Sequence, residues 1–406
     1  MRQWRLLSGD LDIPVEQVKL LYPVSTDEQQ AIIALSQVRR RLGNLSPEIS
    51  RGYDEAGAKK AGLIRWETSG PGDWAEVILR GPQMNVATPI AKQPPNTKHT
   101  DKAVDLTTLD ISAIPRTDYR RATDLSAYQL GQDRWFDSRR RYTEFYRVAW
   151  REMIPASTER SLFPAIIPPG PAHIHAVRSM ALSSNRNTVM VAGFWATIPL
   201  DYALRVGGHG HLDVADARAM PVPDMDHPLS DALLLRTLRL NCLTTAYGDL
   251  WSELYREEWR REEWAVAWPA MRALGAAAPQ WERDTPLRTE RERRSALVEL
   301  DVLAAIMLGL SMDELIALYK SRFPQLVDYE SEMWFDRRGR KLAANFNQWG
   351  HRQTKEHWEQ LQTYLEDPAN NPPPYGYTPP FYKADRIGEY RQAHAAFTKR
   401  MKRVAS

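Results

Sequence analysis

The chain has 406 residues, of which 43% are hydrophobic, so it can bury a large core, and wholesale disorder is excluded. Its formal net charge of only +3 excludes a histone-like basic protein, and any nucleic-acid site must therefore be a local patch. The single cysteine, Cys242, excludes intrachain disulfides and cysteine-based zinc sites, which fits a reducing cytoplasm.

Two further patterns bear on the expected location. Residues 1–17 carry no apolar stretch of the kind that a signal peptide needs. No run in the chain reaches the roughly 18 apolar residues of a transmembrane helix. We therefore expect a cytoplasmic protein that does not contact a membrane.

Residues 1–125 are expected to form a mixed α/β segment. Apolar residues recur at helical spacing in residues 29–42, which predicts a helix. Residues 74–80 alternate between apolar and polar side chains, which predicts a strand. Residues 88–108 are rich in Pro, Lys, Asn and Thr and predict a long loop.

Residues 126–228 are expected to form a strand-rich domain. Three stretches carry β-branched and aromatic residues between turn signals and predict strands: residues 141–151, 161–167 and 187–192. Three prolines, Pro221, Pro223 and Pro228, mark the end of this segment.

Residues 229–406 are expected to be helical. Apolar spacing and capping residues predict helices at residues 232–255, at 295–308, after the capping box Ser311–Glu314, and at 385–402. Residues 336–340 predict a tight turn, and residues 370–380 predict an extended proline-rich connector. The whole chain is thus predicted to be α+β, with three successive segments.

The most informative stretch runs from Arg134 to Gly170, because arginines and aromatic residues alternate in it without any lysine before residue 160. Arginine can grip a phosphate or a guanine edge, whereas aromatic side chains supply packing and stacking surface. The candidate DNA-contacting arginines are Arg134, Arg139, Arg140, Arg141, Arg147, Arg151 and Arg160. The hydroxyls of Ser157 and Thr158 could bond phosphate oxygens.

Two other segments are candidates for DNA contact. Asn185, Arg186 and Asn187 lie in a polar stretch that could reach a groove edge, because Asn pairs well with adenine and Arg with guanine. His209 and His211 lie in a glycine-rich loop and could touch a phosphate.

No catalytic, cofactor-binding or metal-binding residue is assigned to this chain. The glycine-rich residues 207–211 lack the spacing of a dinucleotide-binding loop, and no Walker loop or serine elbow is present. The pairs His173/His175 and His209/His211 each supply only two metal ligands. Residues 371–375 (NPPPY) are similar to the Asn-Pro-Pro-Tyr loop of amino-group DNA methyltransferases, but a proline-rich linker explains them better.

Residues 187–223 combine an apolar run, a helix, a glycine-rich loop ending in His-Leu and the ending Met-Pro-Val-Pro. This order resembles the recognition domains of type I restriction specificity subunits and of TaqI-like adenine methyltransferases. Further pieces resemble the C-terminal part of type IIG-like restriction–modification methylases, including those of BREX and DISARM phage defence: residues 78–82, 115–119, 159–170, 227–243 and 380–385. The resemblance extends from about residue 75 onward.

Those methylases also carry a methyltransferase core with an S-adenosylmethionine loop, which this chain lacks. The resemblance implies a DNA target-recognition (specificity) component that binds double-stranded DNA and positions a separate adenine methyltransferase core. S-adenosylmethionine would bind to that partner, and other defence proteins could join the assembly. Two alternatives stay open: a divergent methyltransferase that uses residues 371–375, and a helical scaffold of a defence complex that does not touch DNA.

Overall fold

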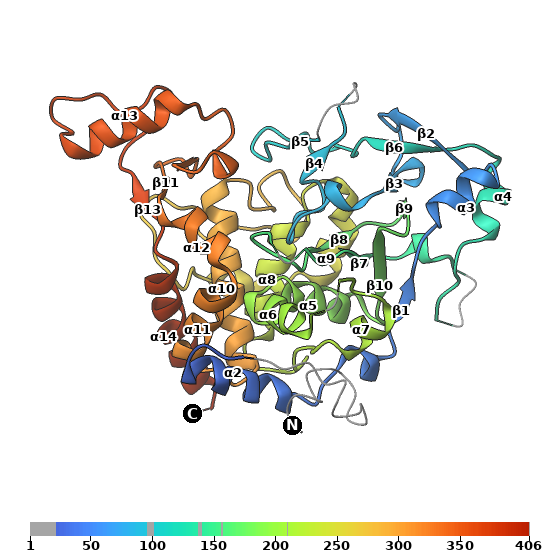
Figure 1. Ribbon diagram of the computed structural model, residues 1–406, viewed down its shortest axis with the longest axis horizontal. Helices are drawn as coiled ribbons and strands as arrows, with labels where there is room; N and C mark the ends of the chain where they lie inside the picture. The colour runs from blue at the N-terminus through green and yellow to red at the C-terminus, as the bar shows by residue number, and fades with distance from the viewer. Residues whose placement is uncertain (1–21, 96–100, 137–139, 156, 209, 406) are drawn as a thin grey trace.

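The computed structural model describes residues 22–95, 101–136, 140–155, 157–208 and 210–405. It combines helices with several small sheets, so the predicted α+β class is confirmed. The strand-rich parts lie on one side of the molecule (Figure 1). The other side holds the C-terminal helices α10 (Glu290–Met307), α11 (Met312–Arg322), α12 (Pro324–Ser331) and α14 (Arg386–Ala405).

The main sheet is antiparallel and has the order β1-β10-β7-β8. Its strands are β1 (Glu48–Ser50), β10 (Val177–Ala181), β7 (Arg147–Arg151) and β8 (Pro164–Ile167). In the register of the sheet, Trp150 of β7 pairs with Arg178 on one side and with Pro164 on the other. The strands predicted within residues 141–151 and 161–167 are therefore confirmed.

One face of this sheet packs on helices α5 (Asn185–Trp195) and α8 (Ser230–Asn241). Trp150 meets Trp195 edge to face, with 5.6 Å between the ring centroids. The strand predicted at residues 187–192 is wrong, because these residues belong to α5. Their β-branched side chains favour a strand, but the Ser184 cap and burial in the helical core override that weak preference.

The other face of the sheet is covered by the N-terminal segment, whose Val77, Leu79 and Met84 pack on Ala149 and Val177. The strand predicted at residues 74–80 is only partly correct. Trp74–Glu76 form a 3₁₀ turn capped by Asp73, and only β3 (Ile78–Leu79) is extended. It pairs in parallel with β9 (Ala172–His173).

The boundaries predicted near residues 125 and 228 do not separate independent cores. Strand β1 from the first segment completes the sheet of the second. Helix α2 (Thr26–Gln37), which confirms much of the helix predicted at residues 29–42, packs against α11 (Met312–Arg322). One continuous core runs from Ala31 to Phe397.

Most of the C-terminal predictions are confirmed. Helix α10 (Glu290–Met307) contains nearly all of the predicted stretch, and the Ser311 hydroxyl accepts a bond from the backbone N of Glu314 at 3.2 Å, as a capping box requires. The predicted turn at residues 336–340 joins β11 (Met333–Phe335) to β12 (Lys341–Ala343). The helix predicted at residues 232–255 is interrupted after α8 and resumes as α9 (Gly248–Leu254).

The remaining helices are α3 (Glu55–Lys60), α4 (Leu125–Leu130), α6 (Ile198–Gly207), α7 (Val214–Ala219), α12 (Pro324–Ser331), α13 (Lys355–Glu366) and α14 (Arg386–Ala405). The remaining strands are β2 (Ile64–Ser69), β6 (Thr117–Arg121), β4 (Lys92–Gln93), β5 (Lys102–Ala103) and β13 (Tyr382–Lys383). Strands β4 and β5 pair within the predicted loop at residues 88–108.

Among the described helices, none is by itself long and apolar enough to cross a membrane; α5 and α6 reach that length and composition only as a pair bent by 70°.

Gly193 allows α5 to approach α8 closely. An added Cβ would lie 1.8 Å from Thr237 Oγ1 and 3.0 Å from Thr237 Cβ. We expect Gly193→Ala to destabilise the protein by about 1–3 kcal/mol in urea denaturation, although alanine is the better helix former. Gly131→Ala is the control, because a Cβ there meets nothing within 4 Å. Equal stability of the two variants would show that the α5–α8 contact is not tight.

Candidate nucleic-acid interface

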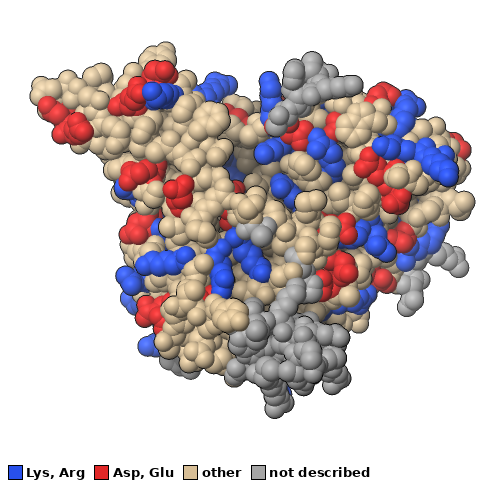
Figure 2. Space-filling model, viewed as in Figure 1, with Lys and Arg blue, Asp and Glu red and all other residues tan. Residues whose placement is uncertain are grey.

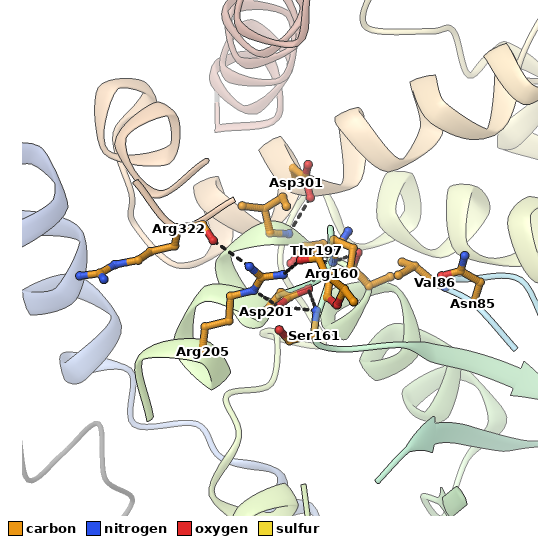
Figure 3. A network of polar contacts seen from close by, with 12 residues as sticks. Asn85, Val86, Arg160, Ser161, Thr197, Asp201, Arg205, Asp301 and Arg322 are labelled. Atoms are coloured by element: carbon orange, nitrogen blue, oxygen red, sulfur yellow. Dashed lines mark hydrogen bonds and ion pairs between the residues drawn. The ribbon is translucent and has the colours of Figure 1, made fainter. Parts of the chain in front are cut away.

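The loop at residues 157–160, predicted to contact phosphate, is held by a buried carboxylate. Asp201 on α6 is fully buried and accepts a bond from Arg160 Nε at 2.6 Å (Figure 3). Arg160 Nη2 donates to the carbonyl of Ala196 at 2.8 Å. Arg160 is only 7% exposed, so its predicted role in DNA contact is corrected: it anchors the loop from inside the protein.

A second arginine fixes the same loop through the same carboxylate. Arg205 Nε donates to Asp201 Oδ1 at 3.2 Å, and Arg205 Nη2 donates to the carbonyl of Thr158 at 2.7 Å. The backbone N of Ser161 also donates to Asp201, at 3.0 Å. Ser157 remains exposed, and Thr158 is half-buried. These bonds therefore anchor the loop as a platform, and Ser157 faces the solvent.

The DNA contacts predicted for Arg147 and Arg151 are also corrected, because both guanidinium groups bond to oxygens inside the protein. Arg147 is fully buried and donates to the carbonyl of Pro171 at 2.6 Å. Arg151 donates from Nε to the carbonyl of Met84 at 3.1 Å, and its guanidinium lies 4.1 Å from the centre of the Phe163 ring. Burial lowers the pKa of each guanidinium to about 10. Both residues share the face of β7 that the N-terminal segment covers, since alternate residues of a strand point the same way.

Arg134, Arg140 and Arg141 lie on the surface. Arg134 and Arg141 face each other across an antiparallel bridge. Arg134 and Arg140 are exposed, and Arg141 is half-buried. Arg140 Nη2 donates to the carbonyl of Glu144 at 2.7 Å and its guanidinium stacks 4.3 Å from the centre of the Phe145 ring. These three side chains can meet a phosphate without unfolding any part of the protein.

The aromatic residues of the same stretch mainly build the core. Trp135, Tyr142 and Trp150 are each no more than 2% exposed. Trp135 packs against Phe145 at a centroid distance of 5.7 Å. The arginine–aromatic stretch thus divides into an aromatic interior and a few surface arginines.

Asn185, Arg186 and Asn187 form the first turn of α5, and not a free loop. The Asn185 amide donates to Glu253 Oε2 at 2.6 Å, and Arg186 Nη1 donates to the carbonyl of Met225 at 2.9 Å. All three residues are half-buried. Contact with a base edge would require Asn185 and Arg186 to release these partners, so the geometry does not favour them as base readers.

The glycine-rich loop lies against the end of β7. His211 is exposed and forms a bridge with Met153, and Gly210 accepts a bond from the backbone N of Ile154 at 3.0 Å. Since Met153 leads into the loop with Ser157, the structure brings together two segments that were predicted separately. Two predicted residues, Arg139 and His209, lie outside the described residues.

The structure also shows the surroundings of the possible metal ligands and of residues 371–375. In the described part of the chain, no group of three or more His, Cys, Asp or Glu side chains could hold a metal ion. Residues 371–375 follow α13 and a turn, not a buried strand. The Asn371 amide donates to the carbonyl of Asp367 at 3.0 Å. This setting does not match that of a methyltransferase loop.

His173 is fully buried and its Nε2 lies 2.8 Å from Ser179 Oγ. Burial and the nearby Arg147 lower its pKa from 6.5 to about 3, so the folded protein keeps this imidazole neutral. Its contribution to stability is complete above pH 6.5 and is lost as the pH falls toward 3, because only the unfolded chain binds the proton in that range.

We therefore expect His173→Gln to have a weaker pH dependence of stability than the wild type. Between about pH 6.5 and about pH 5 the wild type should lose about 2 kcal/mol more than the variant. Urea denaturation at both pH values measures this difference. Parallel losses would show that His173 is protonated in the folded state.

A cleft of about 690 Å³ adjoins the loop at residues 157–160, and Glu159 and Arg160 lie on its edge. Its other walls come from residues 85–91 and 103–108, from α10 and from residues 326–377. Figure 2 shows the hollow between the projecting part of the molecule around α13 and the part around β4 and β5, with basic side chains in view.

Comparison with protein-family models and with curated proteins found no match for this chain.

Proposed function

We propose that this chain is the target-recognition component of a methylation-based restriction–modification or phage-defence system in the cytoplasm. It would bind duplex DNA and position a separate adenine methyltransferase core that binds S-adenosylmethionine. The sequence resemblance to type IIG-like methylases motivates the proposal. Its structural support comes from two loops that meet at the end of β7 and from three surface arginines that precede β7 in the sequence.

The observation that carries the proposal is the meeting of two loops at the end of β7. The loop with Ser157 and the loop with His211 are about 50 residues apart in sequence, yet Met153 and His211 are bridged. The side chains of Ser157 and His211 are exposed, and the buried Asp201 accepts a bond from the backbone N of Ser161 in the first loop. Polar loops with an anchored backbone are suited to contact a DNA backbone, because less ordering is needed when DNA binds.

Arg134, Arg140 and Arg141 supply the electrostatic part of the proposal. Exposed arginines that neutralise phosphates release counterions, so the affinity should fall as salt rises. Arg147, Arg151 and Arg160 are left out of this surface because their donors are used inside the protein. The proposed contact set is thus smaller than the sequence alone suggests.

The test is a double variant, Arg134→Ala with Arg140→Ala, measured by fluorescence anisotropy with labelled duplexes of different sequences. We expect weaker binding to all sequences alike and a salt slope reduced by about two, roughly one for each lost phosphate contact. The matched control replaces Arg256 and Arg260, which are also exposed and paired with acidic side chains. Identical binding by the wild type and the test variant would remove these arginines from the interface.

The partner assignment needs its own experiment. Co-expression with a methyltransferase core should give a complex that methylates adenine, whereas the isolated chain should not transfer a methyl group. Binding of S-adenosylmethionine by the isolated chain would instead favour a divergent methyltransferase. Salt-insensitive binding of protein partners without any duplex binding would favour a scaffold.

A further inference from the structure

The cleft of about 690 Å³ has features that duplex recognition does not explain, and the inference from them is independent of the proposed function. Its volume lies within the range of about 300–1,000 Å³ that is usual for small-molecule sites. Three parts of its lining carry the argument: an exposed tyrosine, two buried arginines without an acidic partner, and an arginine on the rim.

Tyr375 projects from a tight turn on one wall. The backbone N of Tyr377 donates to the carbonyl of Pro374 at 3.0 Å, and Gly376 has a φ of 78°, as a type II turn requires at its third residue. Tyr375 occupies the second position and is 86% exposed. Its backbone N donates to Gln360 Oε1 of α13 at 3.2 Å, so the turn is held in place while the ring stays uncovered.

The ring of Tyr377, on the same wall, is already covered by other side chains. The guanidinium of Arg340 lies 4.7 Å from the centre of its ring, and the His357 ring lies at a centroid distance of 5.4 Å. Arg340 is in turn paired with Asp336 at 2.6 Å. This packing stiffens the wall and leaves Tyr375 as the aromatic surface that is open to a ligand. An open, firmly mounted ring is suited to stacking on a nucleobase.

Arg288 and Arg293 also line the cleft, and their guanidinium groups bond to neutral oxygens. Arg293 donates to the carbonyls of Leu240 and Ala87, each at 2.9 Å. Arg288 donates to the carbonyls of Leu106 and Leu243, each at 3.1 Å. Within the described residues, neither guanidinium has an Asp or Glu at ion-pair distance, and both are less than 10% exposed.

Within the ranges that the structure describes, no direct ion pair neutralises either guanidinium, and the nearest carboxylates, those of Glu292 and Asp284, act on them only at longer range. Burial lowers the pKa of Arg293 to about 9, which still leaves it charged at neutral pH. By contrast, Arg294 and Arg386 in the same cleft are both paired with Glu330. The donors of Arg288 and Arg293 are occupied by protein oxygens, so an anion in the cleft would interact with their charge without forming new hydrogen bonds to them.

Arg352 supplies a third cation at the rim. It lines the cleft, is exposed, and makes no ion pair with any residue that the structure describes. Its φ of 64° places it in the left-handed region, which a non-glycine residue occupies only at a cost. An exposed guanidinium at this place can bond to a phosphate.

We propose that the cleft binds a nucleotide, with its base stacked on Tyr375 and its phosphate near Arg288, Arg293 and Arg352. Stacking on an aromatic ring beside a basic wall is the general chemistry of nucleotide and single-strand binding. The nucleotide can come from two sources, a free mononucleotide or one unit of a DNA strand. Both sources require the same ring and the same cations.

Calorimetric titration of the full chain with AMP, adenosine and inorganic phosphate tests the proposal. AMP should bind more tightly than either of its parts, and Tyr375→Ala should weaken AMP binding about tenfold, whereas Tyr375→Phe should retain it. Tyr22→Ala is the matched control, because Tyr22 is 72% exposed and does not line the cleft. Since Tyr375 is a surface side chain, its replacement should leave the fold intact.

A second variant tests the phosphate. Arg352→Asn should weaken AMP binding and leave adenosine binding unchanged; asparagine is chosen because it tolerates the left-handed backbone. Arg338→Ala is its control, since Arg338 is exposed on the nearby turn outside the cleft.

A short single-stranded oligonucleotide distinguishes the two sources. Oligonucleotide binding that depends on Tyr375, without measurable AMP binding, would support the proposal and identify a DNA strand as the source. Binding of AMP that depends on Tyr375 would support it with a free nucleotide as the source. If neither AMP nor the oligonucleotide binds, or if the binding that is measured does not respond to Tyr375→Ala, the proposal is overturned.

Discussion

Asp201→Ala is expected to destabilise the protein by about 3–5 kcal/mol, which is the usual cost of removing one partner of a buried ion pair. Asp201 is fully buried and accepts from both Arg160 and Arg205. Without the carboxylate, both guanidinium groups would keep their charge in a desolvated site. The backbone N of Ser161 would also lose its acceptor.

Urea denaturation of three variants measures this effect. Asp201→Asn should be intermediate, because its amide oxygen can still accept from Ser161 but carries no charge. Asp226→Ala is the matched control and should stay within about 0.5 kcal/mol of the wild type, because Asp226 is exposed. A loss below about 1 kcal/mol for Asp201→Ala would contradict the description of the loop as an anchored platform.

Glu330→Gln is expected to cost about 3–5 kcal/mol for a related reason at the cleft. Glu330 Oε1 accepts from Arg386 Nη2 at 2.8 Å, and Glu330 Oε2 accepts from Arg294 Nη2 at 2.9 Å. These two arginines join α12 to α10 and α14. Glutamine keeps the shape of the side chain but carries no charge to balance the two buried arginines. The loss of stability therefore measures the electrostatic contribution of Glu330.

The pH dependence gives Glu330→Gln a second signature. Arg294 and Arg386 hold the pKa of Glu330 far below its ordinary value of 4.5, although burial alone would raise it. The stabilisation by Glu330 is therefore complete above pH 4.5 and is lost as the pH falls further. The stability difference between wild type and variant should shrink by about 1.4 kcal/mol for each pH unit below that value. A difference that does not change with pH would show that Glu330 is not ionised when buried.

Local signals in the sequence predicted much of the secondary structure. The capping box at Ser311, the apolar spacing of α10 and the turn at residues 336–340 depend on neighbouring residues only, so they could be predicted. The strand predicted in place of α5 shows the limit of this approach. Its β-branched residues are buried on every side of a helix, and the burial comes from distant segments.

The candidate interface was harder to predict, because burial of an arginine depends on what covers it. Arg147 and Arg151 belong to the same stretch as Arg134 and Arg140. Arg147 bonds to the carbonyl of Pro171 and Arg151 to that of Met84, whereas Arg134 and Arg140 are exposed. The role of Asp201 was not predicted at all, since two of its partners, Arg160 and Ser161, are about 40 residues away. The cleft combines segments from both ends of the chain, and no local pattern marks it.

The salt dependence of duplex binding tests the central claim most directly. The affinity of the full chain for a labelled duplex is measured at several salt concentrations from about 50 to about 200 mM. We predict that the logarithm of the affinity falls linearly with the logarithm of the salt concentration, and that replacing Arg134 and Arg140 makes the fall less steep. The absence of duplex binding at the lowest salt concentration, or binding that salt does not change, would contradict a role in DNA target recognition.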